Sequence, residues 1–126
     1  MALKDLVASA SELREADIEE IVADFVRYDE KGRALVLTTN GNKLPNKAKI
    51  LVLLVADAGW CYISESLSVN GLKPKQIEEL TGIAGGTLRP LLRSLADDRL
   101  VKSENANYKI VAPRLEDIKS LVIGAK

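Results

Sequence analysis

The sequence predicts a mainly α-helical fold that carries a small antiparallel β-hairpin, an α+β class. Several segments repeat apolar residues at the three- and four-residue spacing of an amphipathic helix. Two short β-prone runs near the C-terminus are separated by small and polar residues, which is typical of a hairpin. The chain has 126 residues, 47% of them hydrophobic and 29% charged, as expected for one soluble globular domain.

The first element expected is an amphipathic helix over residues 11–28, with Ser11 as a candidate N-cap. Its apolar residues share one face: Ile18, Ile21, Val22, Phe25 and Val26. Residues 33–39 follow as a β-prone run, which either begins a sheet or forms a hairpin with the end of the preceding segment. The triplet 40–42, Asn-Gly-Asn, predicts a turn.

The second helix is expected over residues 45–58. Pro45 suits its first turn and Gly59 its end. Residues 50–56 are apolar on every side, so this helix is expected to be central and buried. Residues 60–64 are interpreted as a short strand.

Two short helices and a tight turn come next. Pro74 predicts the start of the first helix, and Gly82 predicts its end in the left-handed conformation. The second helix covers 88–98. We expect it to be short and to begin near Thr87, with Thr87 as its cap, because Pro90 is tolerated only in a first turn.

The C-terminal part predicts a hairpin and a last helix. The β-prone runs are 100–102 and 108–111, and the helix covers 114–123. The apolar residues expected on one face of that helix are Leu115, Ile118, Leu121 and Val122. The chain thus divides into an acidic helix with a β-prone segment (1–44), a central part (45–112) and a C-terminal helix (113–126).

Composition excludes several function classes. Histidine is absent and Cys61 is the one cysteine, which excludes histidine triads, disulfides within the chain and cysteine zinc clusters. We therefore expect a cytoplasmic protein that is not an enzyme and has no metal site and no cofactor; no catalytic or phosphate-loop motif occurs. The longest purely apolar run, 50–56, is too short to cross a membrane, and no signal-peptide pattern begins the chain.

The net charge is zero, but the charges are unevenly distributed. Residues 1–30 hold three basic and nine acidic residues, a net charge of −6, and residues 31–126 have a net charge of +6. This asymmetry indicates an acidic arm beside a moderately basic module.

The central part contains the most informative motif, which consists of Ile77, Thr81, Gly82, Ile83, Thr87, Leu88, Leu92, Leu95, Leu100, Val101 and Lys102. With these residues, segment 73–111 resembles the winged helix-turn-helix superfamily of DNA-binding domains, in the pattern shared by MarR-like and ArsR-like transcriptional regulators. The resemblance fits 45–72 only loosely and does not explain 1–44.

This resemblance implies double-stranded DNA binding, with the second helix of the motif in the major groove. Arg89 and Arg93 would then each donate two hydrogen bonds to guanine. Thr87 would contact a phosphate or a thymine methyl group. The helix start that carries Lys73 and Lys75 would lie near phosphates, with a helix N-terminus adding backbone donors.

The same resemblance makes the C-terminal hairpin the wing. Lys102 and Lys109 flank it, and Asn105 and Asn107 would reach the DNA backbone or the minor groove. The apolar faces of helices 11–28 and 114–123 are expected to pair two chains into a homodimer, which would place two recognition helices one turn of DNA apart.

Other interpretations remain open for these residues. One is that Arg89 and Arg93 are ordinary solvated charges, with the nearby carboxylates of Glu78, Glu79, Asp97 and Asp98 as pairing partners. The wing asparagines would be turn formers, and Glu104 would repel phosphates. The alternative function is a winged-helix adaptor that binds proteins within a larger assembly without binding DNA.

Among the aromatic residues, Tyr28, Trp60 and Tyr62 either pack in the core or line a ligand pocket. Cys61 is expected to be a small buried residue, since no basic neighbour in the sequence would lower the pKa of its thiol.

Overall fold

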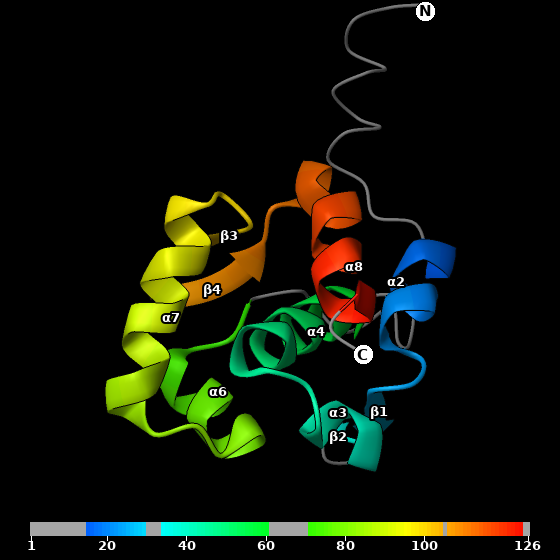
Figure 1. Cartoon of the computed structure of the whole chain (residues 1–126), viewed down its shortest axis with the longest axis horizontal. Coiled ribbons are helices and arrows are strands. Elements are labelled where there is room, and N and C mark those ends of the chain that lie inside the picture. The colour runs from blue at the N-terminus through cyan, green and yellow to red at the C-terminus, as the bar shows by residue number, and fades with distance from the viewer. Residues whose placement is uncertain (1–14, 30–33, 61–70, 105, 125–126) are drawn as a thin grey trace, which may run out of the picture.

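The computed structural model describes residues 15–29, 34–60, 71–104 and 106–124. These residues form two antiparallel hairpins, β1 (Val26–Asp29) with β2 (Ala34–Leu37) and β3 (Val101–Glu104) with β4 (Asn107–Ile110) (Figure 1). Their helices are α2 (Glu15–Val22), α3 (Thr39–Asn42), α4 (Asn46–Ala58), α6 (Pro74–Thr81), α7 (Gly85–Asp97) and α8 (Leu115–Gly124), with a 3₁₀ turn at Ala112–Arg114. The mainly helical α+β class with small antiparallel sheets is confirmed.

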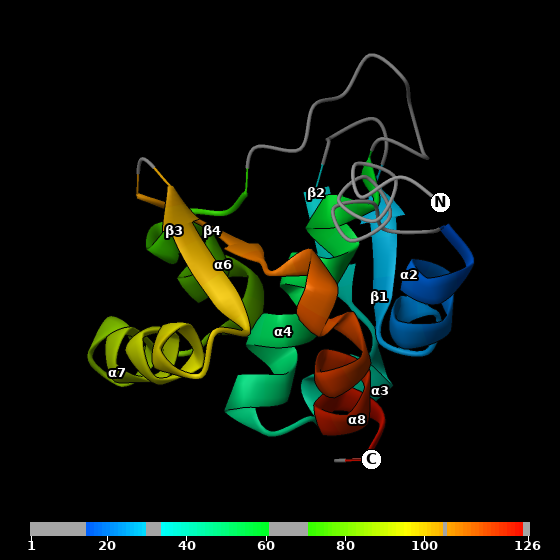
Figure 2. The same ribbon diagram turned by 90° about the horizontal axis from the view of Figure 1, so that it is seen from above.

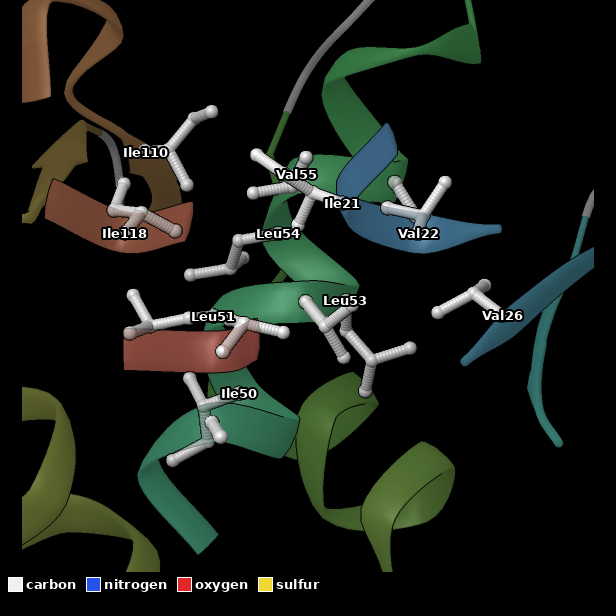
Figure 3. Packing of buried hydrophobic residues seen from close by; sticks show 14 of the residues in the cluster. Ile21, Val22, Val26, Ile50, Leu51, Leu53, Leu54, Val55, Ile110 and Ile118 are labelled. Atoms are coloured by element: carbon white, nitrogen blue, oxygen red, sulfur yellow. The ribbon is translucent and has the colours of Figure 1, made fainter. Parts of the chain in front are cut away.

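Helix α4 is the centre of the fold, as its sequence predicts. Every residue from 50 to 56 is at most 1% exposed. Helices α6 and α7 lie on one side of α4, and α2 and α8 lie on the other (Figures 1 and 2). The side chains of Leu51 and Leu54 point toward Ile118 of α8, while Val55 lies near Ile21 of α2 (Figure 3). A helix that is apolar on all sides can be stable in this position because it meets apolar neighbours in every direction.

The helix expected over residues 11–28 is wrong beyond Val22, and its candidate N-cap Ser11 lies outside the described residues. Helix α2 ends at Val22, and Val26–Asp29 form strand β1, which pairs with β2 in the register Val26 to Leu37. The apolar spacing of 18–26 fits a helix, yet Phe25 and Val26 are buried from a turn and a strand. The pairing with β2 overrides the local periodicity, and the hairpin that the sequence analysis left open is the arrangement found.

The expected turn at 40–42 is a short helix, α3. Thr38 caps it, because the hydroxyl oxygen of Thr38 accepts a hydrogen bond from Gly41 N at 3.1 Å. A Cβ at position 41 would lie 2.3 Å from the carbonyl oxygen of Phe25. Glycine at this position therefore permits the close packing of α3 against the end of the α2 segment.

The α6–α7 pair has the predicted tight turn. Gly82 ends α6 in the left-handed conformation with φ +76°, and its N–H donates to Glu78 O at 2.8 Å. Ile83 is buried in the angle between the two helices. The predicted inward residues Ile77, Leu88, Leu92 and Leu95 are each at most 1% exposed.

The expected start of α7 is wrong. The helix begins at Gly85 with Ala84 as N-cap, so Thr87 lies inside the first turn and does not cap it. The helix has 13 residues, and Pro90 is its sixth. Pro90 has no N–H for the carbonyl of Gly86, but Gly86 is exposed, so water can replace that donor.

The C-terminal hairpin is confirmed, with Val101 opposite Ile110 and Glu104 opposite Asn107. A third segment joins it: Leu72 N donates to Tyr108 O at 3.0 Å, and Tyr108 N donates to Leu72 O at 2.8 Å. The short strand expected at 60–64 is not found at Trp60, and residues 61–64 lie outside the described residues. The β-bridge before α6 is at Leu72 instead.

The terminal helices belong to the common core. Residues of all three segments of the chain contribute to one hydrophobic cluster. Ile18, Ile21 and Val22 of α2 and Leu115, Ile118 and Val122 of α8 are buried in it. Leu121 was expected on the same face of α8 but is 49% exposed. The apolar faces expected to pair two chains are therefore already covered within this chain.

Candidate nucleic-acid interface

The outward surface of α7 displays two arginines one helical turn apart. Arg89 and Arg93 are both exposed, because Leu88, Leu92 and Leu95 orient the opposite face of α7 into the core. Both arginines line a shallow groove of about 800 Å³ together with Pro74 at the start of α6 and Tyr108 on β4. The groove brings α6, α7 and the hairpin together, so three elements of the predicted motif meet at this surface.

The two arginines make no ion pair with any residue that the structure describes. Asp97 lies one further turn along α7 from Arg93 and lines the groove with Asp98, but neither carboxylate is close enough to pair with an arginine. The interpretation of Arg89 and Arg93 as members of surface ion pairs therefore has no support in the described part of the chain. Both guanidinium groups remain available to an external anion.

The N-terminus of α7 already has a carboxylate beside it. A Cβ at Gly85 would lie 3.1 Å from Glu78 Oε1, so the side chain of Glu78 on α6 lies against the first residue of α7. A negative charge at a helix N-terminus stabilises the helix, because it interacts favourably with the positive end of the helix dipole. No side chain donates or accepts a capping hydrogen bond at Ala84, and we infer that Glu78 provides the electrostatic part of the missing cap.

Lys73 and Lys75 flank Pro74 at the start of α6, and both are exposed. The backbone N–H of Lys73 donates to Gln76 Oε1 at 2.9 Å, which fixes the start of α6. Pro74 lines the groove of Arg89 and Arg93, whereas Lys73 borders the separate cavity of about 450 Å³ that Trp60 also lines. The expectation that both lysines lie near bound phosphates stays a prediction.

The β3–β4 hairpin, which the resemblance makes a wing, has less free positive charge than expected. Lys102 and Lys109 stand opposite each other in the hairpin, and both approach one carboxylate: Glu104 lies 3.3 Å from Lys102 and 3.8 Å from Lys109. The hairpin therefore neutralises part of its own positive charge. Asn107 is half-buried at the start of β4, and Asn105 lies outside the described residues.

One cation near α7 was missed by the sequence analysis. Lys47, in the first turn of α4, donates from Nζ to Ser94 Oγ of α7 at 3.0 Å. No motif rule connects two residues that are 47 positions apart. Only the packing of α4 against α7 brings Lys47 to this surface.

Tyr28 and Trp60, the two aromatic residues of this group that the structure describes, pack against each other. Trp60 is 3% exposed and meets the ring of Tyr28 edge-on, with the centroids 5.0 Å apart. Tyr28 donates its hydroxyl to Ala56 O at 2.6 Å. Trp60 also borders a cavity of about 450 Å³ together with Asp57 and Gln76. Cys61 and Tyr62 lie outside the described residues.

Within the described ranges, no group of three or more acidic or cysteine side chains is arranged to hold a metal ion. None of the helices described is both long and apolar enough to span a bilayer. Comparison of the chain with models of protein families, with curated proteins and with solved structures gives no match.

Proposed function

We propose that the chain binds double-stranded DNA as a cytoplasmic transcriptional regulator, through a winged helix-turn-helix formed by α6, α7 and the β3–β4 hairpin. The observation that carries this proposal is the exposed pair Arg89 and Arg93, which have no carboxylate partner among the described residues. An α-helix fits the width of the major groove, and an arginine there can donate two hydrogen bonds to guanine O6 and N7.

The first turn of α7 limits how much sequence this surface reads. Gly85 and Gly86 have no side chain that could contact a base. Thr87 is the first residue of the helix with a side chain. Base discrimination would therefore come mainly from Arg89 and Arg93, at about 1–3 kcal/mol for each bidentate contact. We expect a modest sequence preference over a substantial non-specific affinity.

Phosphate contacts would supply the rest of the affinity. Lys73 and Lys75, exposed on either side of the groove-lining Pro74, would take that role, whereas Lys102 and Lys109 share Glu104 and would contribute less than two free lysines. The acidic helix α2 lies on the side of α4 away from α7 (Figures 1 and 2). Its carboxylates would therefore stay clear of a DNA duplex bound at α7.

The test is the binding of a fluorescently labelled random-sequence duplex, measured by anisotropy across a salt series. We expect binding that weakens steeply with salt, because each phosphate contact releases counterions. The double variant Arg89→Glu/Arg93→Glu should no longer bind the duplex, and its circular dichroism spectrum should match that of the wild type. Arg27→Glu/Lys43→Glu is the charge-matched control, since Arg27 on β1 and Lys43 at the end of α3 are exposed and neither lines the groove. Binding by the double variant at wild-type strength would refute the proposal.

The alternative, a protein-binding adaptor, is favoured by one observation. Asp97 and Asp98 line the same groove as the arginines, and Glu104 lies near both lysines of the hairpin. Such a mixed-charge groove suits a protein segment better than a continuous phosphate backbone. Absence of DNA binding at low salt, with the fold intact, would favour this function.

A homodimer remains part of the proposal, but most of the face expected to form it is buried within the chain. Leu121, from that expected face, and Ile123 are 49% and 36% exposed and are available to a second copy. Light scattering at concentrations above those used for DNA binding tests this point. A monomer under those conditions, with intact DNA binding, would remove the dimer from the proposal.

A further inference from the structure

We infer that Lys47 of α4 is a DNA phosphate contact, positioned by Ser94 of α7. This inference rests on the proposed DNA-binding function and extends its contact surface to an element outside the helix-turn-helix and the wing. The ligand group is a backbone phosphate of the duplex bound by α7, so Lys47 would contribute affinity and no sequence preference.

The first argument is the position of the ammonium group. Lys47 Nζ lies 3.0 Å from Ser94 Oγ, and Ser94 directly follows Arg93. Ser94 and Arg93 both line the groove described above. The charge of Lys47 is thus held at the surface of α7 next to the arginine proposed to enter the major groove.

The second argument is that the ammonium group of Lys47 contacts a neutral side chain and not a carboxylate. Lys102, Lys109 and Lys119 each lie near a carboxylate, whereas Lys47 contacts a neutral hydroxyl and has no ion pair among the described residues. An ammonium group has three N–H donors, and Ser94 accepts from one. The remaining donors stay available on an exposed side chain.

The third argument is that cations from separate elements converge on one surface. Lys47 comes from α4 and Arg93 from α7, and Lys75 is exposed in the first turn of α6, next to the groove-lining Pro74. Asp97 and Asp98 line the same groove, but none of these three cations forms an ion pair with a described carboxylate, so their charges are available to a polyanion. A recognition helix in the major groove has a phosphate backbone along each side, so cations on neighbouring elements have phosphates within reach.

The experiment compares Lys47→Ala with Lys43→Ala in the full chain, by anisotropy on random and on fixed-sequence duplexes across a salt series. Both variants remove one exposed lysine. We expect Lys47→Ala to weaken binding about three- to tenfold on every duplex and to reduce the salt slope by about one. We expect Lys43→Ala to bind as the wild type does. Ser94→Ala keeps all charges, so it should weaken binding less and leave the salt slope unchanged.

The outcomes separate this inference from the function on which it rests. If the wild type binds DNA, Arg89→Glu/Arg93→Glu does not, and Lys47→Ala matches Lys43→Ala, then Lys47 is not a phosphate contact and the proposed function stands. If the wild type does not bind at low salt, both proposals fail. Thermal melts of each variant identify any loss that comes from unfolding.

Discussion

The α2–α8 pair and the outer face of α7 carry their charges in opposite ways. On the α2–α8 side, Lys119 Nζ lies 2.6 Å from Glu20 Oε1, and Arg114 Nε lies 2.7 Å from Asp117 Oδ2. On the α6–α7 side, Arg89 and Arg93 have no carboxylate partner among the residues described. The α2–α8 side matches charges within the chain, whereas the α7 surface leaves cations for an external anion.

This difference shows why the net charge is a poor guide to function here. The chain is neutral overall, yet an approaching polyanion meets the local field of α7 and not the sum over the molecule. Screening at physiological salt limits the influence of charges on the far side of α4 to about 8 Å. The acidic α2 is therefore compatible with an α7 surface that attracts phosphates.

The largest effect is expected from a change in the core of the α2–α8 side. Ile118 on α8 is fully buried, so Ile118→Ala should lower the free energy of unfolding by about 2–5 kcal/mol. Because one cluster joins both sides of α4, the whole chain should unfold in a single transition at lower urea concentration. Unfolding followed by circular dichroism and by Trp60 fluorescence checks this. A first transition in which the α2–α8 side alone unfolds would show that the two sides are independent.

A smaller effect is expected on the α6–α7 side, at the turn between the helices. Gly82 has φ +76°, and a Cβ there would have no atom within 4 Å, so only the backbone conformation opposes a side chain. Gly82→Ala should cost about 1–2 kcal/mol of stability. Gly82→Asn should cost less, because asparagine tolerates the left-handed region better. Equal stability of both variants and the wild type in urea titrations would contradict the role of this turn.

Substitution of the two adjacent glycines of α7 should raise the stability of the chain, in contrast to the two losses predicted above. A Cβ at Gly86 has open space, whereas a Cβ at Gly85 would lie 3.1 Å from Glu78 Oε1. Gly86→Ala should therefore stabilise the chain by about 0.5–1 kcal/mol, the usual gain for alanine over glycine in a helix. Gly85→Ala should gain less, because Glu78 must move. A larger gain from Gly85→Ala than from Gly86→Ala would contradict the contact with Glu78.

The sequence predicts the elements whose signal is local and misses those decided by packing. Helix α4 follows from its apolar run, and the α6–α7 turn follows from Gly82. Strand β1 could not be predicted, because Val26 continues the apolar face of α2 and only the partner strand β2 decides its conformation. The start of α7 at Gly85 was missed because Pro90 was expected in the first turn, whereas the exposed Gly86 lets Pro90 lie deeper in the helix.

The candidate site shows the same division. Helical spacing was enough to place Arg89 and Arg93 on the outer face of α7. The sharing of Glu104 by Lys102 and Lys109 depends on strand register, and the contact of Lys47 with Ser94 depends on how α4 packs. Neither contact leaves a signal in the spacing of residues along the chain.

The smallest effect is expected from the charge pair between α8 and α2. The hydrogen bond to Glu20 raises the pKa of Lys119 above its ordinary value of 10.5, with Glu116 and Asp17 adding attraction. A lysine whose pKa is higher in the folded state stabilises the fold fully below pH 10.5 and loses that contribution as the pH rises through the folded pKa. The Tm of the wild type should exceed that of Lys119→Gln by a small, constant amount up to about pH 10, and the difference should shrink above it. Added salt should reduce the difference as well, since the pair is exposed. A difference in Tm that grows with alkaline pH would show that Lys119 acts through packing and not through its charge.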